Sequence, residues 1–240
     1  MSGLFLYAHR GASAEAPENT LVAFRRALEV GADGVELDVH LSADSVPVVI
    51  HDDTLDRTTD GSGPVAAQSE ASLARLDAGV WFAPEFTGEE LPTLEAALCL
   101  LAGQLRLNVE IKDARAGVAV FNLLRHFPQV DALVSSFDYG VLTQLRRTAP
   151  DLPLALLYDG GSWQRALVRA EALRVCAFHP RADLVSRPLL AACRRLQLPV
   201  YVWTVDDPGL ARSLARAGVA GLFTNDPAGL RGHFPRVSPR

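Results

Sequence analysis

Lysine is nearly absent from this chain. Lys112 is the only lysine among 23 basic side chains, and all the others are arginine. Either it survived by chance or a specific role in the sequence NVEIKD retained it, so we treat it as a candidate functional residue. Acidic side chains outnumber basic ones and give a formal net charge of −5. Because no global positive field attracts a polyanion, the charge argues against nucleic acid as the main partner.

Long apolar runs and paired cysteines are also missing. The N-terminal apolar run, residues 4–8, has no basic residue ahead of it and does not fit a signal peptide, and no later stretch is long enough to span a membrane. Cys99, Cys176 and Cys193 are widely spaced and odd in number, so we expect core residues rather than a disulfide or metal site. There is no Walker loop and no GxGxxG run. We therefore expect a cytoplasmic protein without stable membrane insertion.

The apolar pattern predicts an α/β protein. The chain has 240 residues, close to the roughly 250 typical of one α/β barrel. Short β-branched or apolar segments alternate with amphipathic ones, which is typical of parallel strands joined by helices. The expected strands cover residues 4–8, 34–39, 46–50, 105–111, 132–137, 152–157, 173–178, 198–205 and 219–224. The expected helices cover residues 20–30, 94–101, 116–126, 139–148, 163–170, 187–196 and 208–217. We expect Asn19 and Asp138 to cap helices, and Gly31 and Gly218 to end them.

Two of these nine strands are too close together for a parallel connection. Residues 34–39 and 46–50 are six residues apart, whereas a parallel crossover needs about a dozen. They should form a hairpin, and a two-residue turn at Asp44 and Ser45 would place Asp38 opposite His51. Glu36 shares that face because strand side chains repeat every two residues. Eight strands then remain for a barrel, with two carboxylates and a histidine at the end of the second.

The alternation of strands and helices is interrupted once. Residues 52–91 are rich in Gly, Pro, Thr and acidic residues and carry no regular pattern. A break of this length on a barrel is typical of a segment inserted near the active face. We therefore predict a (β/α)8 TIM barrel that forms one domain over residues 1–240, with a small inserted cap at residues 52–91 after the hairpin.

Polar residues gather where expected strands end. The segments are AHRG (8–11), VELDV (35–39), VVIHD (48–52) and VEIKD (109–113). In a barrel these ends open on one face, where active sites lie. Glu36, Asp38 and Glu110 would supply three oxygen donors, which suit one hard divalent cation, Mg²⁺ or Ca²⁺, better than zinc. The alternative for Glu36 and Asp38 is an exposed strand edge, but their apolar neighbours indicate a buried strand, where unpaired carboxylates are costly.

Two histidines stand beside these carboxylates. A histidine side chain ordinarily titrates near neutrality, so we expect one of His9 and His51 to donate and the other to accept a proton during phosphoryl transfer, and we assign His51 as the base and His9 as the acid. Arg10 and Lys112 would stabilise charge that grows on phosphoryl oxygens, with structural ion pairs as the alternative. The four remaining histidines lack such neighbours, and we expect surface or packing roles for His40, His126, His179 and His233.

Taken together and in order, these segments resemble the glycerophosphodiester phosphodiesterase family across nearly the whole chain. The matching text is HRGASAEAPENT (9–20), residues 31–63, LPTLEAAL (91–98), VEIK (109–112), SSFD (135–138), VYVWTVDD (200–207) and GVAGLFTNDP (218–227). The resemblance implies a (β/α)8 barrel that hydrolyses glycerophosphodiesters to sn-glycerol 3-phosphate and an alcohol with a divalent cation. It implies these residues by role: His9 and His51 for acid–base chemistry, Glu36, Asp38 and Glu110 for the cation, Arg10 and Lys112 for the phosphate, and Phe137 and Trp203 for the glycerol wall. Core packing is the alternative for both aromatic residues.

The sequence departs from the family pattern in the hairpin, where Ser42 and Ser45 replace the common Thr and Gly.

Two rival functions are open. A lysophospholipase D-type enzyme would need an apolar entry surface, for which Val80, Trp81, Phe82 and Phe86 are the candidates. A barrel without activity would bind phosphate ligands, but its retention of both histidines and all three carboxylates argues against this. The expected partner is a small-molecule glycerophosphodiester; the preferred alcohol, the attacking group and the oligomeric state stay open.

Overall fold

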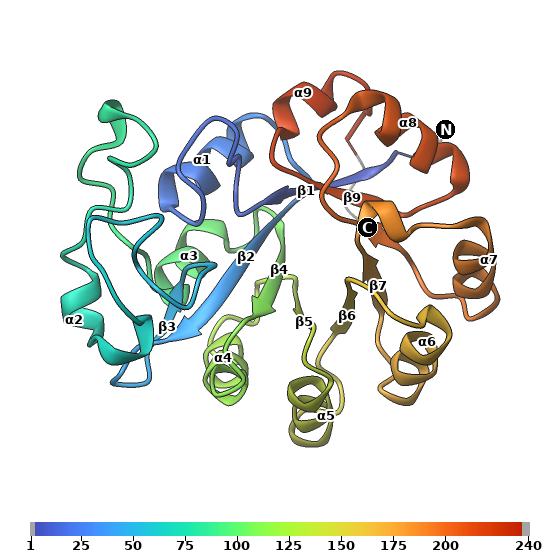
Figure 1. The fold of residues 1–240 in the computed structure, drawn as a ribbon, viewed down its shortest axis with the longest axis horizontal. Coiled ribbons are helices and arrows are strands. Elements are labelled where there is room, and N and C mark those ends of the chain that lie inside the picture. The colour runs from blue at the N-terminus through green and yellow to red at the C-terminus, as the bar shows by residue number, and fades with distance from the viewer. Residues whose placement is uncertain (1–2, 237–240) are drawn as a thin grey trace.

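The computed structural model describes residues 3–236, which form a ring of parallel strands surrounded by helices (Figure 1). The strands are β1 (Phe5–His9), β2 (Gly34–Leu41), β3 (Pro47–Val49), β4 (Arg106–Ile111), β5 (Ala132–Ser136), β6 (Leu154–Tyr158), β7 (Ala177–Pro180), β8 (Tyr201–Val202) and β9 (Gly221–Thr224). Eight of them pair in parallel in the order β7-β6-β5-β4-β2-β1-β9-β8. Parallel bridges from Phe178 to Val200 and from Arg181 to Trp203 join β7 to β8. The (β/α)8 barrel predicted from the sequence is confirmed.

Helices cover the outside of this ring. They are α1 (Leu21–Glu29), α3 (Leu94–Leu101), α4 (Ala116–Leu124), α5 (Tyr139–Thr148), α6 (Trp163–Ala172), α7 (Arg187–Arg195), α8 (Pro208–Ala217) and α9 (Pro227–Arg231). The first seven are the predicted helices, and α9 was not predicted. Each long helix buries an apolar stripe against the strands, as Ala23, Phe24 and Ala27 of α1 do. One large apolar cluster between the helices and the barrel results.

Helix ends follow the sequence with one exception. Asp138 caps α5 by accepting hydrogen bonds from two backbone N–H groups, and Gly31 and Gly218 adopt left-handed φ angles of 77° and 86°. Asn19 does not cap α1, so that prediction was wrong. Thr20 is the cap, because its side chain accepts from the N–H of Ala23 at 3.3 Å. Asn19 has a φ of 60° and turns its amide elsewhere.

The hairpin of β2 and β3 forms, but its register differs by one residue from the prediction. Val39 pairs with Val49, and the Ser42 N–H donates to the carbonyl of Val46 at 3.0 Å. The loop therefore has three residues, and Ser45 takes the left-handed position with a φ of 66°. Asp38 consequently lies opposite Ile50, whose N–H donates to its carbonyl at 3.0 Å, and not opposite His51.

Residues 52–91 form a compact segment beside β3 (Figure 1). They contain η1 (Val65–Ala67), α2 (Glu70–Leu73) and η2 (Pro84–Phe86), joined by turns. A second apolar cluster fixes the segment to the hairpin, with Val48, Ile50, Leu55, Val65, Leu73, Ala78 and Leu91 as its buried members. Among residues 3–236, no helix combines the length and apolar character that crossing a membrane requires. The predicted domain also included residues 1–2 and 237–240, which lie outside the described residues.

Large aromatic side chains fill the barrel. Tyr7 stacks on Phe223 with their ring centroids 4.8 Å apart, and Tyr201 meets Tyr7 edge-on at 5.6 Å. Gly34 on β2 makes room for this packing, because a Cβ there would come within 2.6 Å of the Tyr7 ring and 2.8 Å of the Arg106 carbonyl. The absence of a side chain at Gly34 thus lets a large ring occupy the floor beneath the strand ends.

Substitution of Gly34 by alanine should destabilise the protein by about 1–3 kcal/mol, because the new methyl group overpacks a rigid interior. The free energy of unfolding, measured by urea denaturation, checks this value. Gly232→Ala is the matched control, because Gly232 has a φ of −61° and open space around its Cβ position. Equal stability of the Gly34 variant and the wild-type protein would contradict the packing described above.

Candidate active site

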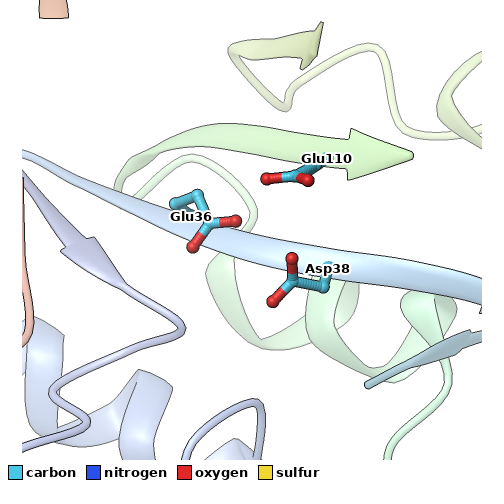
Figure 2. Close-up of side chains that lie close together, drawn as sticks. All are labelled: Glu36, Asp38 and Glu110. Carbon is cyan, nitrogen blue, oxygen red and sulfur yellow. The ribbon is translucent and has the colours of Figure 1, made fainter. Parts of the chain in front are cut away.

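Three buried carboxylates lie together at the end of the second and third parallel strands. Glu36 and Asp38 come from β2 and Glu110 from β4, and Asp38 and Glu110 are direct neighbours in the parallel register. Each offers an oxygen within 4.8 Å of the others' (Figure 2). All three side chains are buried. This grouping is the one that the sequence led us to expect.

Burial and mutual repulsion shift the titration of this group. Burial, then Asp38 and Glu110, raise the pKa of Glu36 well above its ordinary value. Burial and Asp38 raise the pKa of Glu110 to about 7. Burial opposes ionisation of Asp38 as well, but Arg10, His51 and Lys112 outweigh it and hold its pKa below the ordinary value. Since Glu36 Oε1 has no hydrogen-bond partner among the described residues, the cluster suits a hard divalent cation.

Arg10 and Lys112 supply positive charge beside the carboxylates. The backbone N–H of Arg10 donates to Glu36 Oε2 at 2.9 Å, and the side-chain Nε of Arg10 lies 3.3 Å from Asp38 Oδ2. Arg10 adopts a left-handed φ of 58°, which aims its N–H at Glu36. Lys112 Nζ lies 2.9 Å from Glu110 and 3.8 Å from Asp38. Although burial opposes its charge, these two carboxylates raise the pKa of Lys112.

His9 ends β1 and is held by a neutral amide. Its Nδ1 lies 2.7 Å from Asn225 Oδ1, and the Asn225 amide donates from Nδ2 to Asp206 at 2.9 Å. Because a carboxylate only accepts, Asp206 fixes the amide with its oxygen toward His9, so His9 Nδ1 carries the proton. His9 Nε2 then faces Glu36 at 3.9 Å. Burial, followed by the charge of Arg10, lowers the pKa of His9 to about 4.

His51 follows β3 and is held by a carboxylate. Its Nδ1 lies 2.6 Å from Asp52 Oδ1, and its Nε2 lies 3.1 Å from Lys112 Nζ. The ring of His40 supports the backbone here, because its Nε2 lies 3.1 Å from the carbonyl of His51. His51 therefore reaches the carboxylates from the loop after the hairpin, although the register that we had predicted for it was wrong.

A cavity of about 200 Å³ connects these groups. Phe137, Leu157, Trp203 and Phe223 form one wall, and the other carries His9, Arg10, Glu36, His51, Asn108, Glu110 and Lys112. Phe137 and Trp203 meet edge-on with centroids 5.5 Å apart, and 39% of Phe137 is exposed. A groove of about 270 Å³ between β3, α3 and α4 is larger, but it lies apart from the carboxylate cluster and the two histidines. The ionisable groups thus single out the smaller cavity as the candidate site.

Several residues of this site were not predicted from their chemistry. Asn19 donates from Nδ2 to Asp38 at 2.9 Å, and Asn108 lines the cavity with its amide held by Ser135. Asp206 and Asn225 support His9 from segments more than 190 residues away in the sequence, and the only sequence signal was their place in the matched segments 200–207 and 218–227. Asp52 directly follows His51 in the sequence, but adjacency alone did not reveal that its carboxylate contacts the His51 ring.

Comparisons with known proteins agree with this geometry. Residues 9–229 match the model of the glycerophosphoryl diester phosphodiesterase family. The glycerophosphodiester phosphodiesterase of Caldanaerobacter subterraneus is 37% identical over 92% of this chain and 93% of its own. A solved phosphodiesterase of Oleispira antarctica, in complex with the product sn-glycerol-3-phosphate, is 30% identical, with a TM-score of 0.90 over 96% of each chain. The glycerophosphodiester phosphodiesterase of Agrobacterium tumefaciens is 33% identical, with a TM-score of 0.86 over 95% of this chain and 99% of its own. The chain therefore belongs to the glycerophosphoryl diester phosphodiesterase family.

Proposed function

We propose that this protein hydrolyses glycerophosphodiesters to sn-glycerol 3-phosphate and an alcohol, with one divalent cation, Mg²⁺ or Ca²⁺. The observation that carries the proposal is a single cavity lined by two histidines, two cationic side chains and two carboxylates, which cluster with a third buried carboxylate, Asp38. The Oleispira antarctica neighbour, which binds sn-glycerol-3-phosphate, supports the substrate class. Family membership supports the reaction.

Glu36, Asp38 and Glu110 would hold the cation. Their oxygen donors and the unpartnered Oε1 of Glu36 fit a hard cation, and the repulsion among them is relieved when one binds. A bound divalent cation would polarise the phosphoryl group and offset charge on its oxygens. Arg10 and Lys112 would bind the phosphate next to it, because both lie within ion-pair distance of Asp38.

The walls of the cavity suit the two ends of the substrate. Phe137 and Trp203 would pack against the carbon atoms of the glycerol, and Trp203 is fixed because its Nε1 donates to the carbonyl of His179 at 2.8 Å. Residues 52–91 would act as a cap on this face, since their first residue is the partner of His51. The exposed Val80 and Trp81 of that segment are the surface that a lysolipid substrate would use.

The partners of the two histidines support the opposite order of proton transfer from the one assigned from the sequence. His9 faces a neutral amide and has a pKa lowered to about 4, so it is neutral with an open Nε2 and would accept the proton of the attacking hydroxyl group, whether water or glycerol. The carboxylate of Asp52 lies 2.6 Å from His51 Nδ1 and would balance the charge of a proton carried on Nε2 once Lys112 turns to the phosphate, so His51 would protonate the oxygen that leaves as the P–O bond breaks.

Leaving-group chemistry tests the proposal and this order. His51→Ala should lower the turnover of glycerophosphocholine by about 10²–10⁴-fold, because the departing alkoxide lacks a proton donor. It should lower turnover of a glycerol nitrophenyl phosphodiester far less, since nitrophenolate leaves without protonation. His9→Ala should impair both substrates equally. The exposed His126→Ala is the matched control. If His9→Ala instead spared the nitrophenyl substrate and His51→Ala impaired both substrates, His51 would be the base. Turnover of lysolipids alone would favour the lysophospholipase D hypothesis.

Removal of the cation should abolish turnover and lower the melting temperature, because the three carboxylates then repel one another.

Asp38→Asn should weaken Mg²⁺ or Ca²⁺ binding by roughly tenfold or more, since the count of charged ligands sets affinity at such sites. Isothermal titration calorimetry checks this value, with the exposed Glu29→Gln as the control. Full activity in the presence of a chelator would overturn the metal-dependent mechanism.

Cation binding should depend on pH because the cation competes with a proton on Glu110. The pKa of this carboxyl is raised from 4.5 to about 7, so its proton stabilises the cation-free fold below about 4.5 and that contribution is lost as pH rises through about 7. Affinity for the cation should therefore increase as pH rises from 6 to 8, with proton release. Calorimetry in two buffers of different ionisation enthalpy measures both quantities. A dissociation constant that is flat over this range would contradict the raised pKa.

A further inference from the structure

Arg57, in the segment of residues 52–91, forms two forked ion pairs beside the residues that line the site. Its Nε and Nη2 donate to the two oxygens of Asp52 at 2.7 and 3.0 Å. Its Nη1 and Nη2 donate to the two oxygens of Glu18 at 2.8 Å each. One guanidinium thus holds two carboxylates bidentately, a geometry that fixes direction as well as distance.

Each of these carboxylates also holds a residue that the proposed reaction uses. Asp52 Oδ1 lies 2.6 Å from His51 Nδ1, and Glu18 Oε1 accepts from Arg10 Nη1 at 2.8 Å. Arg57 itself is 44% exposed and does not line the cavity, whereas Arg10 and His51 both do. Arg57 therefore contacts the site only through the partners of those two residues.

Opposite charges alternate from Arg10 to Asp52 along this chain of contacts. From Arg10 the path runs through Glu18, Arg57 and Asp52 to His51, and Lys112 returns from His51 to Asp38, which lies beside Arg10. Without Arg57, two carboxylates would face each other without a cation between them. The hydrogen bonds of Arg57 lower the pKa of Asp52. Burial opposes ionisation of Glu18, but Arg57 and Arg10 together outweigh it and lower the pKa of Glu18, so both carboxylates stay ionised.

We propose that Arg57 is a positioning residue that sets the phosphate-binding Arg10 and the proton-transferring His51 in their working orientations through Glu18 and Asp52. The inference rests on the proposed function, because it assigns Arg57 to that same site. A simpler role, in which Arg57 only fastens the segment to the barrel, would affect stability without affecting substrate binding or proton transfer.

Steady-state kinetics and binding separate these roles. Arg57→Ala should lower kcat/KM by about 10- to 100-fold, the usual effect of losing a residue that orients a site group. KM should rise because Arg10 loses the orientation in which it binds the phosphate. In the same way, kcat should fall because His51 loses the orientation in which it transfers a proton. Glu18→Gln should reproduce mainly the change in KM, and Asp52→Asn mainly the change in kcat. Arg57→Lys should recover only part of the loss, because an ammonium group cannot fork between two carboxylates.

Arg75→Ala is the matched control, since Arg75 is an exposed arginine of the same segment whose hydrogen bonds go to Ala71 and Ser72 of the preceding helix α2. If Arg57→Ala lowers only the melting temperature and keeps the KM and kcat of the wild-type protein, the inference is overturned. A double-mutant background gives a second test. In a protein that already carries Glu18→Gln and Asp52→Asn, adding Arg57→Ala should lower kcat/KM by less than about threefold. A further loss as large as that seen in the wild-type background would also overturn the inference.

Failure of the proposed function would look different. A wild-type protein that hydrolyses no glycerophosphodiester overturns the proposed function. Titration of sn-glycerol 3-phosphate then tests the placement of Arg10 by Arg57 independently of turnover. Weaker binding by Arg57→Ala than by Arg75→Ala supports it, and equal binding overturns it.

Discussion

Repulsion among three buried carboxylates is the constraint on which the rest of the site depends. The parallel pairing of β2 with β4 places Asp38 and Glu110 side by side, and Glu36 follows on the same face of β2. Burial of such a group is costly unless cations and hydrogen-bond donors offset the charge. The left-handed backbone of Arg10, the amide of Asn19 and the single lysine of the chain all contribute to that offset. The left-handed backbone at Arg10 and at Asn19 thus serves the same electrostatic need.

The fold and most of the site could be predicted from the sequence because each depends on local patterns. The alternation of apolar and amphipathic segments predicts parallel strands joined by helices. Such strands bring Glu36, Asp38 and Glu110 to one face of the barrel, independently of the conformation of the loops. The register of the hairpin could not be predicted in the same way. It depends on Ser45 taking a left-handed conformation, which serine adopts less readily than glycine. A single residue in a turn therefore moved His51 by one position along the strand.

The partners of the site residues were beyond sequence reasoning for a different reason. Asn19 looked like a helix cap because asparagine is common there, but Thr20 takes that position and Asn19 binds Asp38. Asn225 meets His9 across 216 positions of sequence, a contact that only closure of the barrel creates. The same limit applies to proton transfer. Two histidines read alike in a sequence, and what distinguishes them is an amide beside one and a carboxylate beside the other.

The pairing of β1 with β9 has a consequence for synthesis of the protein. A nascent chain that has left the ribosome only as far as β8 already contains both histidines, all three carboxylates, Arg10 and Lys112. Its first strand still lacks one neighbour, and His9 lacks the amide that selects its tautomer. Pairing of β9 with β1 therefore both closes the barrel and brings the amide of Asn225 to His9. The order of synthesis itself delays completion of the site until the ring of strands is whole.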